Sequence, residues 1–98
     1  MQTVTAGGAR IPIVGLGTWT LKGRECARLV EEAIAAGYRH IDTAQLYDNE
    51  AEVGEGVRAS GLRDQVFITT KVRPENLHAN DLERTAKESV ARLGVDQL

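Results

Sequence analysis

The length and composition of the chain limit what it can be. Ninety-eight residues allow one small domain at most. A content of 42% hydrophobic and 27% charged residues is typical of a folded globular chain rather than of a disordered one. The formal net charge of -2 argues against a protein that binds the phosphate backbone, because such proteins usually carry a basic surface. We therefore expect a single domain over residues 1–98 without a nucleic-acid partner.

The sequence also limits where the chain works. No apolar run approaches the roughly 20 residues that a membrane-spanning helix needs. The residues from Met1 to Thr5 lack the basic stretch and apolar core of a secretory signal. Cys26 is the only cysteine, so no internal disulfide can form, and no cysteine–histidine cluster suggests a metal site. These features predict a cytoplasmic location, no membrane partner and no bound metal.

The first predicted element is a β-hairpin. Two short β-prone runs, 4–5 and 11–13, flank a turn that contains Gly7 and Gly8. Pro12 cannot donate a hydrogen bond to a strand ladder, which places this piece at a sheet edge.

Three strand–helix pairs are predicted after the hairpin. The strands are expected over residues 14–19, 39–44 and 66–72. The helix after the first strand has its buried face at helical spacing and ends at a glycine. That face comprises Cys26, Leu29, Val30, Ala33, Ile34 and Gly37.

Cap signals place the other two helices. Asn49 is expected to cap the second helix, with Glu52 reaching back to the backbone N–H of Asn49. The inner face of that helix carries Val53 and Val57, and Gly61 ends it.

The third helix repeats the pattern, with Asn80 as its expected cap and Gly94 as its end. Its predicted buried stripe comprises Leu82, Ala86, Val90 and Leu93.

Alternation of strands and helices predicts a parallel sheet covered by helices. Residues 95–98 are interpreted as the approach to a fourth strand. An eight-unit βα barrel takes roughly 250 residues, and an open doubly wound sheet has about five or six strands. We therefore expect an N-terminal piece of a larger α/β fold, which by itself is prone to self-association at its last strand.

Ligands of parallel α/β folds bind at the carboxyl ends of the strands. The predicted strand ends therefore supply the candidate site residues, so that an acid, a phenol, an ammonium group and an indole meet at one edge. They are Gly17, Thr18 and Trp19 after the first strand, Asp42, Thr43 and Tyr47 after the second, and Thr70, Lys71 and Arg73 after the third.

Each candidate has a structural alternative. Asp42 can form an ion pair that only stabilises the fold, and Lys71 can lie on the surface with its stem packed. Tyr47 can pack its ring and hydrogen-bond its hydroxyl, and Trp19 can belong to the core. Structural or surface roles are expected for His40 and His78, and a place in the core for Cys26.

The segment around the second strand resembles a known signature. The matching residues are Gly37-Tyr38-Arg39-His40-Ile41-Asp42-Thr43-Ala44, then Tyr47, Glu50, Val53 and Gly54. Segments 15–19 and 68–71 match in order and spacing as well. Together they resemble the aldo-keto reductases, and residues 42–50 look most like bacterial 2,5-diketo-gluconate reductases of the B type, which also reduce methylglyoxal-like aldehydes.

This resemblance implies a fold and a reaction. The fold is a (β/α)8 TIM barrel whose bottom is closed by an N-terminal hairpin, and residues 1–98 would be the N-terminal portion of that single domain. The reaction is the transfer of hydride from NADPH to a small aldehyde or ketone. The full-length form is expected to be a monomer.

The resemblance also assigns site residues. Asp42, Tyr47 and Lys71 fill three of the four places of the family's catalytic set. The fourth, a histidine, is expected beyond Leu98. Gly17, Thr18, Trp19 and Asp42 would lie near the nicotinamide, and Trp19 and Tyr47 would contact the substrate.

The chemistry of these side chains suits carbonyl reduction. The phenol of tyrosine has a pKa of about 10 in model peptides, so it carries a proton to donate at neutral pH. An adjacent ammonium favours the anion that is left, which gives Tyr47 the role of general acid assisted by Lys71. Asp42 would keep Lys71 charged and in position.

The alternative is a catalytically inert fragment that serves at most as an interaction module. The length of the chain supports this alternative, because neither the expected histidine nor most of the cofactor-binding residues are among the 98 residues. A phosphate-binding α/β module is less well supported, because no glycine-rich turn opens a helix.

Overall fold

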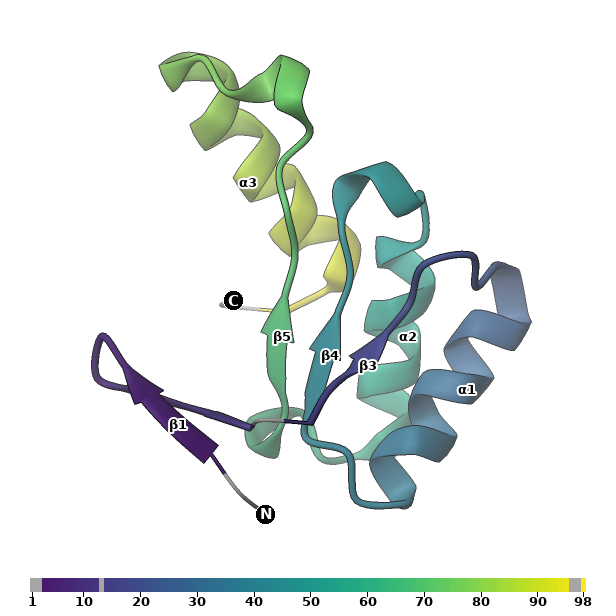
Figure 1. Ribbon diagram of the computed structural model, residues 1–98. Coiled ribbons are helices and arrows are strands. Elements are labelled where there is room, and N and C mark those ends of the chain that lie inside the picture. Colours follow the sequence, from purple (N-terminus) through teal and green to yellow (C-terminus); the bar gives the residue numbers. More distant parts are fainter. Residues whose placement is uncertain (1–2, 13, 96–97) are drawn as a thin grey trace.

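The computed structural model describes residues 3–12, 14–95 and 98, and they form a small α/β unit (Figure 1). A two-stranded hairpin precedes a three-stranded parallel sheet in the order β3-β4-β5. The strands are β1 Thr3–Ala6, β2 Ala9–Pro12, β3 Leu16–Gly17, β4 His40–Asp42 and β5 Phe67–Thr69. The helices are α1 Gly23–Ala35, α2 Glu50–Ser60 and α3 Ala79–Leu93, with single 3-10 turns η1 Gln45–Tyr47, η2 Arg63–Gln65 and η3 Pro74–Asn76. None of these described helices is long and apolar enough to cross a bilayer.

The predicted hairpin is confirmed. β1 and β2 pair antiparallel and the last pair is Ala6 with Ala9. Gly7 and Gly8 form the two-residue turn with φ angles of 54° and 80°, a left-handed conformation that glycine adopts without a steric penalty. Ile13, which the sequence assigned to this hairpin, lies outside the described residues.

His40 joins the hairpin to the parallel sheet. Its Nδ1 lies 3.2 Å from the Pro12 carbonyl oxygen, and because a carbonyl only accepts, Nδ1 is the donor. The Nε2 atom lies 2.9 Å from Thr69 Oγ1, and the imidazole meets the Phe67 ring edge to face. These contacts place the hairpin near the amino-terminal ends of the parallel strands (Figure 1) and give His40 the structural role that the sequence predicted.

The sheet has one helical face. β3 pairs with β4, and β4 with β5, in parallel register, with Asp42 opposite both Gly17 and Thr69. Ile41 and Ile68 are buried at the centres of their strands, whereas the residues on either side of each are half-buried. The core combines these two isoleucines with apolar residues of the helices and of the approach to β5. Its members are Cys26, Val30, Ile34, Ile41, Val53, Val57, Val66, Ile68 and Leu93.

The strands are shorter than the sequence predicted. The predictions 14–19, 39–44 and 66–72 correspond to strands of only two or three residues. Pairing nevertheless continues beyond their ends, because Thr18 N–H donates to the Asp42 carbonyl at 3.0 Å and Thr43 N–H to the Thr69 carbonyl at 2.8 Å. The chain therefore leaves the regular ladder while its backbone remains hydrogen-bonded.

Helix α1 follows the prediction with one correction. Cys26, Val30 and Ile34 are fully buried, and Leu29 is half-buried. Gly37 ends the helix with a φ of 115°, but it is exposed and does not belong to the buried face. Ala33 is half-buried as well, and Ala27 is an additional buried residue that the sequence pattern missed.

The capping prediction for helix α2 is wrong in its mechanism. Asn49 precedes the helix, but its side chain makes no capping hydrogen bond. The Nδ2 group donates to the carbonyls of Thr18 at 2.8 Å and Leu21 at 3.0 Å, and Oδ1 accepts from the Thr43 hydroxyl at 2.9 Å. A fully buried amide with these three partners has no freedom to cap. The predicted end of the helix at Gly61, with a φ of 72°, is confirmed.

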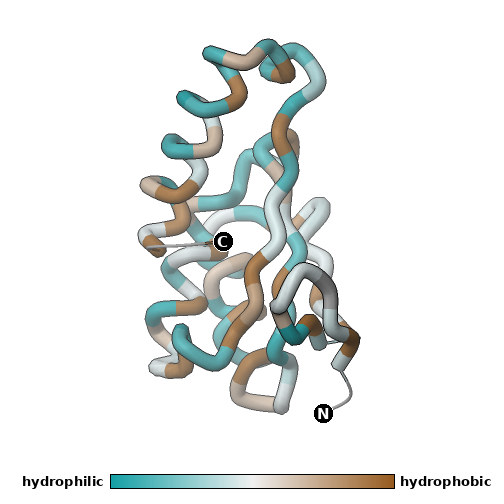
Figure 2. Tube along the Cα trace, turned by 90° about the vertical axis from the view of Figure 1, so that its left-hand side faces the viewer, coloured by the Kyte–Doolittle hydropathy of each residue, from teal (hydrophilic) through white to brown (hydrophobic). Residues whose placement is uncertain are grey.

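Helix α3 begins earlier and turns differently than predicted. It starts at Ala79, so Asn80 lies inside the helix and does not cap it. Figure 2 shows hydrophobic and hydrophilic residues alternating along this helix, and the fully buried ones are mainly polar. They are Thr85, Ser89 and Leu93.

Leu82, which the sequence placed in the buried stripe of α3, is 41% exposed, and Ala86 and Val90 are half-buried. The physical reason is that the buried side-chain amide of Gln45 donates to the Thr85 carbonyl and to Ser89 Oγ, so this side of α3 faces inward. The predicted end at Gly94 is confirmed by its φ of 66°. The predicted approach to a fourth strand falls largely on residues 96–97, which lie outside the described residues.

Close packing of α1 on α2 generates a stability prediction. A Cβ atom at Gly56 would lie 2.5 Å from the Ala27 carbonyl oxygen and 2.7 Å from Val30 Cβ. Alanine favours a helix interior over glycine by about 0.5–1 kcal/mol, but overpacking costs about 1–3 kcal/mol. We expect Gly56→Ala to lower the free energy of unfolding measured by urea denaturation.

The control is Glu55→Ala, because Glu55 is exposed on the same helix and its change should stay within about 0.5 kcal/mol. A Gly56→Ala chain as stable as the parent would contradict the described packing.

Candidate functional site

Three predicted site residues meet at the carboxyl ends of the parallel strands. We call this edge the rim and define it by residues 17–19, 42–47 and 69–73. Asp42 ends β4, Tyr47 ends η1, and Lys71 lies two residues beyond β5. The Lys71 ammonium donates a hydrogen bond to Asp42 Oδ1 in a short ion pair. The same ammonium lies 5.3 Å from the centre of the Tyr47 ring. The rim thus gathers a carboxylate, a phenol ring and an ammonium group from two successive strand ends.

Backbone hydrogen bonds hold the segments that carry these side chains. Gln45 N–H donates to the Lys71 carbonyl at 3.0 Å, which ties the start of η1 to the segment after β5. Tyr47 N–H donates to the Ala44 carbonyl at 3.1 Å within the 3-10 turn. From the other side, Lys22 Nζ donates to the Tyr47 carbonyl at 3.2 Å. Each end of the turn therefore has a fixed neighbour.

The electrostatics of the rim favour a charged Lys71. Partial burial acts to lower the pKa of its ammonium, but the hydrogen bond and charge of Asp42, with a contribution from Tyr47, outweigh burial and raise that pKa. The two side chains of the ion pair are 50% and 43% exposed, so water screens their attraction and its contribution to stability is small.

The first strand end is arranged around a buried threonine. Thr18 is fully buried, and its hydroxyl lies 3.3 Å from the Asp42 carbonyl, to which it donates. Gly17 is exposed, and a Cβ atom there would meet nothing within 4 Å. Trp19 is 72% exposed, and within the described part of the chain no ring contact joins it to Tyr47. The structure therefore places residues 17–19 at the rim but leaves the indole in solvent.

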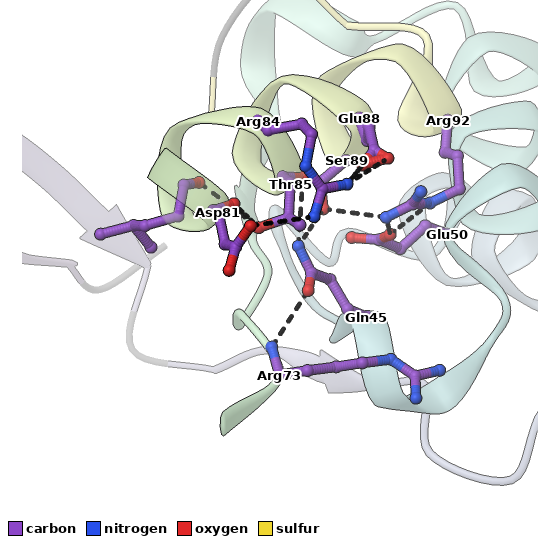
Figure 3. A network of polar contacts seen from close by, with 10 residues as sticks. Gln45, Glu50, Arg73, Asp81, Arg84, Thr85, Glu88, Ser89 and Arg92 are labelled. Atoms are coloured by element: carbon purple, nitrogen blue, oxygen red, sulfur yellow. Dashed lines mark hydrogen bonds and ion pairs between the residues drawn. The ribbon is translucent and has the colours of Figure 1, made fainter. Parts of the chain in front are cut away.

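A polar network beside the rim was missed by sequence reasoning (Figure 3). Glu50 is only 3% exposed; it accepts a hydrogen bond from the Thr70 hydroxyl at 2.6 Å and pairs with Arg92 at 2.7 Å. Gln45, 6% exposed, links the rim to α3 through its side-chain amide. The available signal was that Glu50 and Gln45 both lie within the matching segment 42–50, whereas nothing in the sequence connects Arg92 to the rim.

A cavity of about 530 Å³ lies beside this network, and Asp42, Tyr47 and Lys71 are not among its lining residues. Its walls are mixed in charge, and each of its three arginines has an acidic partner: Arg73 pairs with Glu75, Arg84 with Glu88 and Arg92 with Glu50. The arginine charges in this cavity are therefore paired within the protein.

Cys26 and His78 lie away from the rim chemistry. Burial, assisted by the Glu52 carboxylate and opposed by Lys22, raises the pKa of the Cys26 thiol to about 11. A thiol that stays protonated in the core is a poor nucleophile. His78 is exposed at the start of α3. These placements agree with the core position expected for Cys26 and the surface role expected for His78.

The chain is similar to proteins of one family. Residues 13–98 match the model of the aldo/keto reductase family. Methylglyoxal reductase DkgB of Yersinia pestis is 45% identical over 87 residues, which cover 88% of this chain and 33% of that protein. The chain thus spans about a third of the length of the curated relatives it matches.

Solved structures agree with the sequence match. A structure described as 2,5-diketo-D-gluconic acid reductase B is 43% identical with a TM-score of 0.91, covering 98% of this chain and 34% of that one. A Bombyx mori aldo-keto reductase in complex with NADP is 40% identical with a TM-score of 0.82, covering 91% and 33%. The family resemblance drawn from residues 37–54 is confirmed.

The raised pKa of Lys71 predicts a pH dependence of stability. In model peptides, which represent the unfolded chain, the lysine ammonium has a pKa of about 10.4. Because the folded-state pKa is higher, the stabilisation is fully present below that pH and is lost as pH rises through the folded pKa. We expect the stability advantage of the parent over Lys71→Met to be level from pH 7 to 9 and to shrink at higher pH in urea denaturation.

The matched control is Lys87→Met, which removes a more exposed lysine on α3. A parent advantage over Lys71→Met that grows above pH 10 would contradict the described pairing.

Proposed function

We propose that this chain, which belongs to the aldo/keto reductase family, forms the N-terminal portion of a (β/α)8 barrel enzyme that reduces aldehydes and ketones with NADPH. The observation that carries the proposal is the meeting of Asp42, Tyr47 and Lys71 at the rim. In barrels of this kind the reaction site lies at the carboxyl ends of the strands. A proton donor, an ammonium and a carboxylate at that place suit the reduction of a carbonyl group.

The rim residues fit a nicotinamide cofactor. Gly17 leaves open space where a side chain would stand, and Trp19 presents an exposed ring beside it. The Asp42 carboxylate is 43% exposed and keeps an oxygen for a polar group. We assign Gly17, Thr18, Trp19 and Asp42 to the nicotinamide end; for the buried Thr18 side chain this role is limited to its backbone and its support of Asp42. When bound, NADPH supplies the hydride.

The proton reaches the carbonyl oxygen from Tyr47. Protonation of the oxygen as the hydride arrives leaves the Tyr47 phenolate, which the Lys71 ammonium stabilises by its charge. The ion pair with Asp42 keeps the ammonium charged and fixes its direction. Donors held in place where charge would develop on the carbonyl oxygen are the means by which such sites stabilise a transition state.

Small dicarbonyl compounds are the proposed substrates. Proteins named as methylglyoxal reductase and 2,5-diketo-D-gluconic acid reductase B are among the relatives, and residues 42–50 resemble that group. Trp19 would supply an apolar wall against the substrate and Tyr47 its polar contact, and Trp19 is free to do so because most of its ring is exposed. A monomeric whole protein and a cytoplasmic location stay predictions.

An inactive fragment is the second candidate for the 98 residues by themselves. It is favoured by the span of about a third of the relatives. It is also favoured by the two histidines: His40 is bound to the hairpin and His78 lies at the start of α3, so neither fills the fourth catalytic place. The isolated chain would then leave NADPH unoxidised in the presence of methylglyoxal, whereas the chain as a complete catalyst would oxidise it.

The role of Tyr47 is tested in the whole protein that carries this chain. Tyr47→Phe removes the donated proton and keeps the ring, so we expect carbonyl reduction to fall by about 100-fold or more, within the range that general acid catalysis contributes. NADPH binding, measured by fluorescence titration, should stay within a few-fold of the parent.

Tyr38→Phe is the matched control, because Tyr38 lies in the loop between α1 and β4 and outside the rim. A Tyr47→Phe enzyme with near-normal turnover would remove Tyr47 from the acid role.

A further inference from the structure

We propose that Gln45 is a positioning residue for Lys71, because its side-chain amide replaces a backbone carbonyl that the β4–β5 pairing would otherwise need. This inference rests on the proposed function only for its catalytic consequence. The structural part concerns how the chain keeps Lys71 opposite Asp42 and Tyr47 after β5 has ended at Thr69.

Backbone N–H groups that follow β4 go on donating to carbonyls at and beyond the end of β5. With Asp42 opposite Thr69, Thr43 N–H donates to the Thr69 carbonyl at 2.8 Å and Gln45 N–H to the Lys71 carbonyl at 3.0 Å. In a parallel ladder the next bond runs from Arg73 N–H to the backbone carbonyl of Gln45.

That carbonyl is engaged elsewhere. The chain turns into η1 after Ala44, and the Gln45 carbonyl accepts from Asp48 N–H at 3.2 Å. Arg73 N–H instead donates to the side-chain Oε1 of Gln45 at 3.0 Å. The side chain thus supplies the acceptor that the 3-10 turn has taken from the ladder, and the same residue begins the turn that carries Tyr47.

Helix α3 fixes the orientation of the amide. Gln45 Nε2 donates to the Thr85 carbonyl at 3.1 Å and to Ser89 Oγ at 3.0 Å (Figure 3). A carbonyl can only accept, so a flipped amide would bring Oε1 against the Thr85 carbonyl and Nε2 against Arg73 N–H. Because Gln45 is only 6% exposed, water cannot repair that mismatch. The amide therefore has one satisfied orientation.

Lys71 depends on this arrangement because few contacts fix its side chain directly. The side chain is 50% exposed and Asp42 is its ion-pair partner. Its backbone lies between two bonds to Gln45, one at the Lys71 carbonyl and one at Arg73 N–H. Loss of the amide frees the segment that leads to Pro74 and lets the ammonium drift from Asp42 and Tyr47.

If the Gln45 amide only stabilised the fold, its removal would have a different effect from the removal of a positioning residue. The distinguishing readout is the pKa of Lys71, followed by NMR of ε-¹³C-labelled lysine in the whole protein that carries this chain, with circular dichroism at each pH to confirm folding. Asp42→Asn gives the reference for an unpaired Lys71. This measurement needs no cofactor and no turnover, so it stands apart from the fate of the proposed function.

We expect Gln45→Met, which keeps the length and volume of the side chain, to move the Lys71 pKa at least halfway from the parent value to that of Asp42→Asn. Hydrogen exchange of Arg73 N–H should accelerate at least tenfold while Phe67 N–H, bonded to the Arg39 carbonyl, stays protected. The matched control is Val57→Ala, which loosens the core away from the rim and should lower the melting temperature without moving the Lys71 pKa.

Gln45→Asn serves as a second variant if Gln45→Met does not fold, since it keeps an amide that is too short to reach both Arg73 and α3. A folded Gln45 variant with an unchanged Lys71 pKa overturns the inference. In the whole enzyme, a lower kcat at unchanged NADPH affinity supports it, whereas unchanged kcat with the amide removed contradicts the catalytic consequence.

Discussion

The parallel register of β4 and β5 is the constraint on which the site depends. Asp42 stands opposite Thr69, so the residues that follow each strand leave the sheet side by side. The pairing then continues through Thr43 and Gln45 into the segment that holds Lys71. A one-residue slip would turn Asp42 toward the helices and bring Ile41 to the other face. The buried Ile41 opposes that slip, since the slip would remove it from the core that it shares with Ile68. The hydrophobic core thereby determines where the charged groups meet.

Where the strands end, side-chain amides supply hydrogen bonds to backbone groups that a regular ladder would otherwise provide. Asn49 ties together the loops after β3 and β4 through two carbonyls and a hydroxyl. Gln45 completes the ladder after β5 and joins it to α3. Both amides are buried with their hydrogen bonds satisfied, which makes each a specific connector rather than a cost. The rim can therefore be irregular, as its chemistry requires, without leaving backbone groups unpaired.

The order of elements and the rim residues were predictable from sequence because they depend on local signals. Paired glycines indicated the hairpin turn, and Gly61 and Gly94 indicated helix ends, where a positive φ is required. The position of Asp42, Tyr47 and Lys71 followed from the rule that ligands bind at strand ends. The capping roles of Asn49 and Asn80 were wrong, and so was the burial of Leu82. For Asn49 and Leu82 a distant partner decided the outcome: Asn49 donates to the Thr18 carbonyl, and α3 turns Thr85 and Ser89 inward to accept from Gln45. Such long-range polar contacts leave no spacing pattern in a single sequence.

We propose that the Asp42–Lys71 pair and Tyr47 form one reaction site with the nicotinamide. The most direct test is a crystal structure of the whole protein with NADP bound. We expect the nicotinamide to lie beside Gly17 and Trp19, with the Lys71 ammonium still paired with Asp42 and the Tyr47 hydroxyl directed to the same space. A nicotinamide bound away from the rim, or a Lys71 that has turned from Asp42 into solvent, would contradict it.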